Sequence, residues 1–237
     1  MAARVAADPL LHWVQLFRRG SRLPIALCLH LELLETAFHL SDERITTLKS
    51  HWWVEALRDD SGRRHPLLEA LCADANSASR HALGRALLTL SAAGTPVDIE
   101  AMWAQALPLA TAAAGLVDAA PATVALHGFL WRLRLPLPGP HNAGLCPLSL
   151  RARHQLPAPL APVHWPPALR QAWLAALQTL WQDARQPAAT AADAVLAALL
   201  ERELVQGVLR PARWQPGHGV RGFGALWTAW RAAVRAR

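Results

Sequence analysis

The chain has 237 residues, of which 53% are hydrophobic and 17% charged, with 24 Lys+Arg against 17 Asp+Glu and a formal net charge of +7. So much apolar character and so little charge exclude a disordered tail. The length suits one domain or two small ones, and a composition rich in alanine and leucine favours helices. We therefore expect an all-α fold.

The positive charge is carried almost entirely by arginine, since Lys49 is the only lysine. The arginines are spread along the chain, with small groups at 18–22, 63–64, 151–153 and 231–237. Nucleic-acid binding through charge requires a basic stripe or patch, so we expect no nucleic-acid partner. An attraction to anionic lipid or diphosphate is compatible with this charge.

The cysteines and the longest apolar stretch bear on the compartment. Cys28, Cys72 and Cys146 lie far apart and form no CxxC pair, which is typical of a reducing cytosol. Pro108 and Gly115 interrupt the uncharged stretch 101–117, so it is a poor membrane span. We expect a cytoplasmic protein that is at most peripheral to a membrane.

Apolar residues recur at helical spacing from residue 27 onward. Leu27, Leu31, Leu34 and Phe38 form one stripe and predict the first clear helix. The next predicted helix, 41–58, begins with Ser-Asp-Glu, whose side-chain oxygens can cap its first turn. We expect its apolar face to consist of Ile45, Leu48, Trp52 and Ala56, with the opposite face formed by Arg44, Thr47, His51, Glu55 and Arg58.

The rest of the chain predicts more helices and two irregular connections. The connections, 135–147 and 157–167, are rich in proline and glycine. The helices are expected at 66–73, 79–93, 97–119, 122–134, 148–154, 168–185, 191–209 and 223–235. In the last of them, one apolar face is shared by Phe223, Leu226, Trp227, Trp230 and Val234.

Two acids interrupt the otherwise apolar helix that carries Leu27 and Phe38. Glu32 and Glu35 are three residues apart, so they lie on one helical face. Two such acids can hold a divalent cation. The other interpretation is the solvent edge of an amphipathic helix, completed by His39.

Several segments resemble the squalene/phytoene synthase family, in its divergent bacterial branch. The family's segment K/R-L-x-W-W-R-E-x-[LI] and its following H-P-[VL]-x-x-A-L are matched by LKSHWWVEAL at 48–57 and HPLLEAL at 65–71. Later family segments are matched by GFLWR at 128–132, PLSLRARH at 147–154 and LWTAWRAA at 226–233. The resemblance implies one domain over residues 1–237, an all-α helical bundle of the isoprenoid synthase type around a central cavity.

The resemblance also says what this chain lacks. Family enzymes join two prenyl diphosphates head to head and hold Mg²⁺ with two DxxxD motifs on facing helices. Here the first motif should fall on the helix of Glu32 and Glu35, where DxxxD is absent, and 128–140 contains no acid at all. We therefore expect a catalytically silent protein with no catalytic residue, no metal and no cofactor, which binds an isoprenoid or lipid or assists the assembly of a protein partner. The candidates to line its ligand pocket are Glu32, Glu35, Lys49, Trp53 and Arg132.

Two other functions stay open. A residual head-to-head prenyltransferase would use Glu32 and Glu35 as half of a Mg²⁺ site, with Arg132 on phosphate. A small nucleic-acid-binding module would follow from charge alone.

Overall fold

All regular secondary structure in the described part of the chain is helical. The computed structural model describes residues 8–17, 21–40, 42–59, 65–72, 77–117, 119–134, 142–156, 159–215, 217 and 220–236, and no strand occurs among them. The all-α prediction is therefore confirmed for these residues. The elements are α2 (Pro9–Phe17), α3 (Leu23–Phe38), α4 (Glu43–Arg58), α5 (Pro66–Cys72), α6 (Ser77–Ser91), α7 (Ile99–Ala114), α8 (Pro121–Arg132), the 3₁₀ turn η1 (Asn142–Leu145), α9 (Leu148–Arg153), the 3₁₀ turn η2 (Pro162–His164), α10 (Pro167–Ala184), α11 (Ala191–Leu209) and α12 (Phe223–Arg235).

Helix α3 is the centre of the arrangement. It contacts α2, α4, α5, α6, α7 and α8, and a helix surrounded in this way must be apolar on all sides. The predicted stripe Leu27, Leu31, Leu34 and Phe38 is buried, as expected, and so is most of the remaining helix surface.

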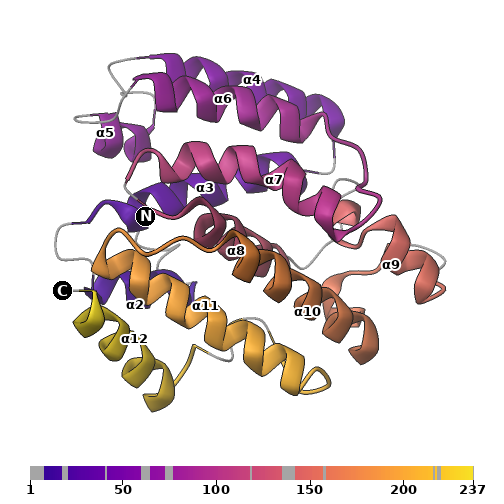
Figure 1. Ribbon diagram of the computed structural model, residues 1–237. Coiled ribbons are helices and arrows are strands. Elements are labelled where there is room, and N and C mark those ends of the chain that lie inside the picture. Colours follow the sequence, from indigo (N-terminus) through magenta and orange to yellow (C-terminus); the bar gives the residue numbers. More distant parts are fainter. Residues whose placement is uncertain are drawn as a thin grey trace.

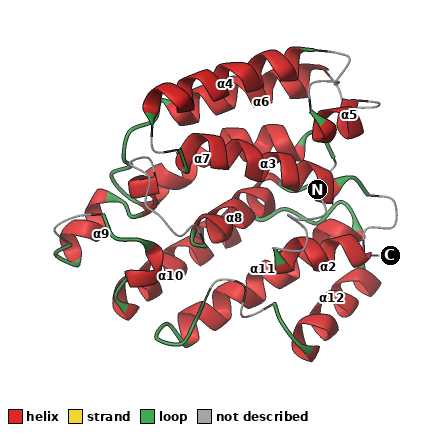
Figure 2. Cartoon of the chain, turned by 180° about the vertical axis from the view of Figure 1, so that it is seen from behind, coloured by secondary structure: helices red, strands yellow, loops and turns green. Residues whose placement is uncertain are grey.

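The other helices lie on either side of this centre. Helices α4 and α6 run side by side at one edge, while α2 and α12 lie at the opposite edge, as both views show (Figures 1 and 2). Helices α7 and α8 pack together, and α10 and α11 form a second pair that leads to α12.

Most helix positions agree with the sequence prediction. The spans of α11 and α12 match it at both ends. Helix α4 has the expected cap, since the Asp42 carboxylate accepts from the backbone N–H of Arg44 at 2.8 Å. Helix α7 is shorter than predicted: it begins at Ile99 because Asp98 caps it by accepting from Ala101 N–H at 2.7 Å, and it ends at Ala114, with Gly115 as its C-cap. Helix α2 was not predicted, and residues 135–141 of the first predicted connection fall outside the described ranges.

The predicted faces of α4 are right in part. Ala56 of the predicted apolar face is buried, and the predicted opposite face is exposed throughout, at Arg44, Thr47, His51, Glu55 and Arg58. Ile45, Leu48 and Trp52 are exposed, whereas the buried face carries Thr46, Ser50, Trp53, Val54, Ala56 and Leu57. Its polar members are satisfied locally, because Thr46 donates to the Asp42 carbonyl at 3.0 Å and the hydroxyls of Ser50 and Ser91 lie 3.1 Å apart.

The five apolar residues predicted to share one face of α12 do lie on one stripe of the helix, and this stripe faces solvent. The helix packs on α11 and α2 through Ala225, Ala229 and Ala233, and Trp227 and Trp230 are exposed. Elsewhere tryptophan does form part of the core, since six of the eleven tryptophans are buried.

None of the described helices has both the length and the hydropathy that are needed to cross a bilayer.

Candidate functional site

Three of the five residues predicted to line a ligand pocket lie near one another, on α3 and α4. The Trp53 ring is buried, and its Nε1–H donates to the hydroxyl of Thr36 at 3.2 Å. That hydroxyl in turn donates to the backbone carbonyl of Glu32 at 3.0 Å. The chain Trp53–Thr36–Glu32 thus fixes α4 against the acid-bearing turn of α3.

His65, just before α5, completes this cluster. Its ring centroid lies 4.9 Å from that of Trp53. Burial lowers the pKa of His65, while the negative charge of Glu32 raises it and the positive charge of Lys49 lowers it further. Glu32 and Lys49 therefore both lie within electrostatic reach of the imidazole. The sequence indicated His65 only as part of the HPLLEAL match.

Arg132 and Glu35 occupy other positions. Arg132 ends α8 and is buried, with its guanidinium carbon 3.5 Å from the centroid of the Phe38 ring. Burial lowers the pKa of Arg132 to about 9. Glu35 is half-buried on α3, three residues before Phe38. Arg132 therefore contacts the end of α3 through the ring of Phe38.

The described residues leave little space between α3 and α8. A Cβ on Gly128 of α8 would come within 2.7 Å of the Leu34 side chain and 2.8 Å of the His30 ring. The two pockets beside Arg132 have volumes of about 10 Å³ and 20 Å³. Each volume is of the size that one water molecule requires.

A buried ionic network links the start of α2 to the end of α8. The Asp8 carboxylate lies 3.1 Å from Nε2 of His127 and 3.0 Å from the Arg134 guanidinium, and it accepts from the backbone N–H of Leu10 at 2.9 Å. Burial alone would raise the pKa of Asp8, but His127 and Arg134 hold it well below its ordinary value. No local pattern indicates this network, because Asp8 and His127 are 119 residues apart in sequence.

A pocket lies on the other side of Arg134, between α8, α10 and the segment that follows α11. Its volume is about 710 Å³, which falls within the range of small-molecule sites. We call it the arginine pocket, because its lining includes three arginines and no carboxylate. The lining residues are Leu133, Arg134, Pro162, Val163, Arg170, Ala212, Arg213, Trp214 and Gln215.

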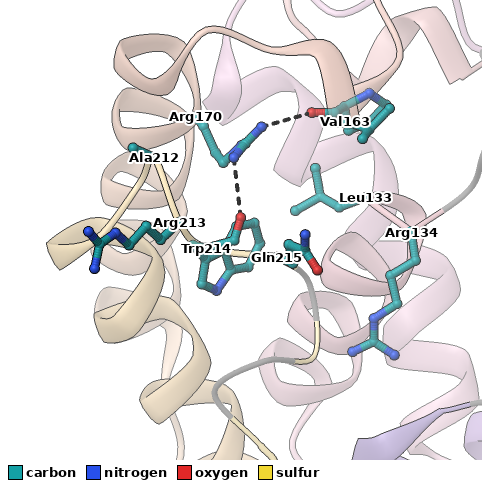
Figure 3. Close-up of a pocket in the computed structure, with 9 residues that line it drawn as sticks. Leu133, Arg134, Val163, Arg170, Ala212, Arg213, Trp214 and Gln215 are labelled. Atoms are coloured by element: carbon teal, nitrogen blue, oxygen red, sulfur yellow. Dashed lines mark hydrogen bonds between the residues drawn. The ribbon is translucent and has the colours of Figure 1, made fainter.

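Arg170 builds the wall of the arginine pocket. Its guanidinium donates to the carbonyls of Pro211 and Trp214 at 3.0 and 3.2 Å, and to those of Pro162 and Trp165 at 3.5 and 3.2 Å. These bonds tie η2 to the segment after α11 (Figure 3). Burial lowers the pKa of Arg170, and no carboxylate is among these four partners.

The remaining polar groups surround the opening. Gln215 and Leu133 lie in the middle of the pocket, while Arg213 extends away from Gln215 (Figure 3). The indole N–H of Trp214 is buried without a hydrogen-bond partner in the described part of the chain. An anionic ligand in the pocket would lie in the positive field of Arg170. Sequence reasoning missed this pocket.

A search for three or more neighbouring His, Cys, Asp or Glu side chains that could hold a metal ion finds none within the described ranges. Comparison of the chain with protein-family models, curated proteins and solved structures finds no match.

Proposed function

We propose that this protein is a catalytically silent relative of the squalene/phytoene synthases, which binds an isoprenoid or lipid with an anionic head in the arginine pocket and acts as an accessory or assembly factor. The observation that carries the proposal is the pocket itself, with a volume of about 710 Å³ and a lining that holds three arginines and no acid. The family relationship rests on the sequence resemblance.

The filled interior between α3 and α8 supports the silent character. In the family enzymes the resemblance places the diphosphates between facing helices that carry carboxylates. Here Arg132 stacks on Phe38 at this place, and His30 and Leu34 close on Gly128. A diphosphate that lost its metal ion would lose several kcal/mol of transition-state stabilisation, or about a thousand-fold in rate.

The composition of the arginine pocket supports an anionic, partly apolar ligand. Leu133, Pro162 and Val163 offer apolar surface, while Arg134 and Arg170 supply positive charge. Asp8 offsets the charge of Arg134, so Arg170 contributes the uncompensated charge inside the pocket. An isoprenoid diphosphate or an anionic lipid combines the two required features.

Isothermal titration calorimetry with farnesyl diphosphate, and with farnesol as the uncharged comparison, tests the proposal. We expect binding of the diphosphate without Mg²⁺ and much weaker binding of farnesol. Gln215→Glu places a negative charge in the middle of the pocket and should weaken diphosphate binding roughly ten-fold. Gln182→Glu makes the same change at an exposed position of α10 and should leave binding unchanged.

Two results would contradict the proposal. Absence of diphosphate binding, or equal weakening by both glutamate variants, would remove the pocket assignment. Formation of a condensed C30 product from farnesyl diphosphate with Mg²⁺ would instead establish the residual prenyltransferase. That alternative predicts that Glu32→Ala abolishes Mg²⁺-dependent diphosphate binding.

A further inference from the structure

Helix α12 presents a large apolar face to solvent. Its alanines, Ala225, Ala229 and Ala233, pack inward, and five large apolar side chains on the outside keep 41–79% of their surface exposed. The five are Phe223, Leu226, Trp227, Trp230 and Val234. At 100° per residue they fall within one stripe of the helix. We call this stripe the α12 face.

The α12 face differs from ordinary scattered surface residues. Trp227 and Trp230 stack on each other, with ring centroids 5.0 Å apart and planes inclined by 26°. The two rings thus form one continuous aromatic surface, and Leu226 and Val234 extend it along the helix. Contiguous exposed apolar patches on a folded protein mark interaction sites.

The charge of the C-terminal segment that carries the α12 face is one-sided. From residue 204 to 237 the sequence contains six arginines and neither Asp nor Glu, so this segment contributes +6 of the net +7. The remaining 203 residues hold 18 Lys+Arg against 17 acids. Arg231 and Arg235 are exposed on α12, next to the apolar stripe. Almost the whole net charge of the chain therefore lies in this segment, where Arg213 lines the arginine pocket and Arg231 and Arg235 flank the α12 face.

We propose that the α12 face binds the surface of an anionic membrane. An exposed amphipathic helix with arginines beside a stripe of Trp, Phe and Leu is the arrangement that lies in the plane of the lipid interface. The paired tryptophans then sit at the headgroup level, which tryptophan prefers. The arginines contact lipid phosphates and carboxylates.

Two other occupants fit the observations less well. A symmetric dimer through α12 would bring two +6 segments against each other, which like charges oppose. A nucleic acid would satisfy the arginines but would leave Leu226 and Val234 against its phosphates. The membrane alone satisfies both the charge and the apolar stripe. This inference does not depend on the arginine pocket, because the α12 face shares no residue with it.

Co-sedimentation of the full chain with vesicles tests the proposal. We expect binding to phosphatidylcholine vesicles that contain 30% phosphatidylserine, much weaker binding to pure phosphatidylcholine, and weakening by salt. The double variant Trp227→Ala/Trp230→Ala should weaken binding at least ten-fold. Arg231→Gln/Arg235→Gln should weaken it about 25-fold, or five-fold for each charge.

The control uses the exposed apolar face at the opposite edge of the molecule. Trp52→Ala on α4 removes an exposed tryptophan of similar accessibility and should leave vesicle binding unchanged. Brominated acyl chains should quench the wild-type fluorescence and should not quench that of the double tryptophan variant. Circular dichroism checks that every variant remains folded.

Distinct results would overturn the proposal. It fails if the wild type ignores anionic vesicles, or if Trp52→Ala weakens binding as much as the double variant does. It also fails if light scattering shows that the wild type is a dimer and that only Trp227→Ala/Trp230→Ala converts it to a monomer. It fails likewise if a DNA duplex binds the protein more tightly than the vesicles do. Gln215→Glu alters the arginine pocket and should still bind vesicles. Vesicle binding by this variant would show that α12 binds the membrane whether or not the arginine pocket binds a ligand.

Discussion

The buried imidazole of His30 makes a quantitative prediction about stability and pH. His30 lies on α3 and is 2% exposed, and its Nδ1 has no hydrogen-bond partner among the described residues. Burial, and secondarily the nearby His127, lower the pKa of His30 from 6.5 to about 3. The folded protein therefore holds this imidazole neutral over the range in which the unfolded chain binds a proton.

The direction of the effect follows from linkage. Because the pKa of His30 is lower in the folded state, its contribution to stability is complete above pH 6.5 and is lost as the pH falls toward 3. Between pH 7 and pH 5, a shift from 6.5 to about 3 lowers the free energy of unfolding by about 2 kcal/mol. Acid should thus destabilise the protein well above the range in which carboxylates titrate.

The assay is urea unfolding at pH 7 and pH 5, followed by circular dichroism at 222 nm. His30→Leu removes the titration while it keeps an apolar side chain of similar size, so its loss between the two pH values should be about 2 kcal/mol smaller than that of the wild type. His51→Gln alters an exposed histidine on α4 and should behave as the wild type. Equal pH dependence of the wild type and His30→Leu would refute the reasoning.

Three further substitutions test the packing and the networks, each by urea unfolding. Gly128→Val should destabilise the fold by about 1–3 kcal/mol, because its Cβ would meet the Leu34 side chain at 2.7 Å; an unchanged midpoint would show that α8 shifts freely. Asp8→Asn should cost about 2–4 kcal/mol at pH 7, and since the folded pKa of Asp8 is lowered, this difference should shrink below pH 3.8; a difference independent of pH would contradict the pairing with Arg134. Trp53→Phe should cost about 1–2 kcal/mol through the lost bond to Thr36 and the smaller ring; full stability would show that this bond contributes nothing.

The sequence could predict helices better than the faces they bury. The stripe from Leu27 to Phe38 is correct because α3 is surrounded, so every apolar residue on it finds a neighbour. In α12 two apolar stripes compete, one of alanines and one with Trp227 and Trp230, and the small one packs inward. Periodicity places both stripes on the helix but carries no information about which one meets α11.

In the candidate site, too, some residues could be predicted from the sequence and others could not. Lys49 and Trp53 came from a sequence motif, and the structure places them near Glu32 and His65. The arginine pocket depends instead on Arg170, whose acceptor carbonyls at Pro211 and Trp214 lie 41 and 44 residues away. Backbone carbonyls have no sequence signature, so a pocket built from them could not be predicted.

The position of α2 has a consequence for the order in which the chain folds during synthesis. Helix α2 packs on α11 and α12, and the indole N–H of Trp13 donates to the carbonyl of Val220 at 2.7 Å, across 207 residues. A helix of nine residues is not stable alone in water. At ribosomal rates, roughly 10–40 s separate the synthesis of α2 from that of its partners. Although α2 is made early, it should therefore be among the last of these helices to settle, and Leu10, Leu11 and Val14 stay available to chaperones until α11 and α12 emerge.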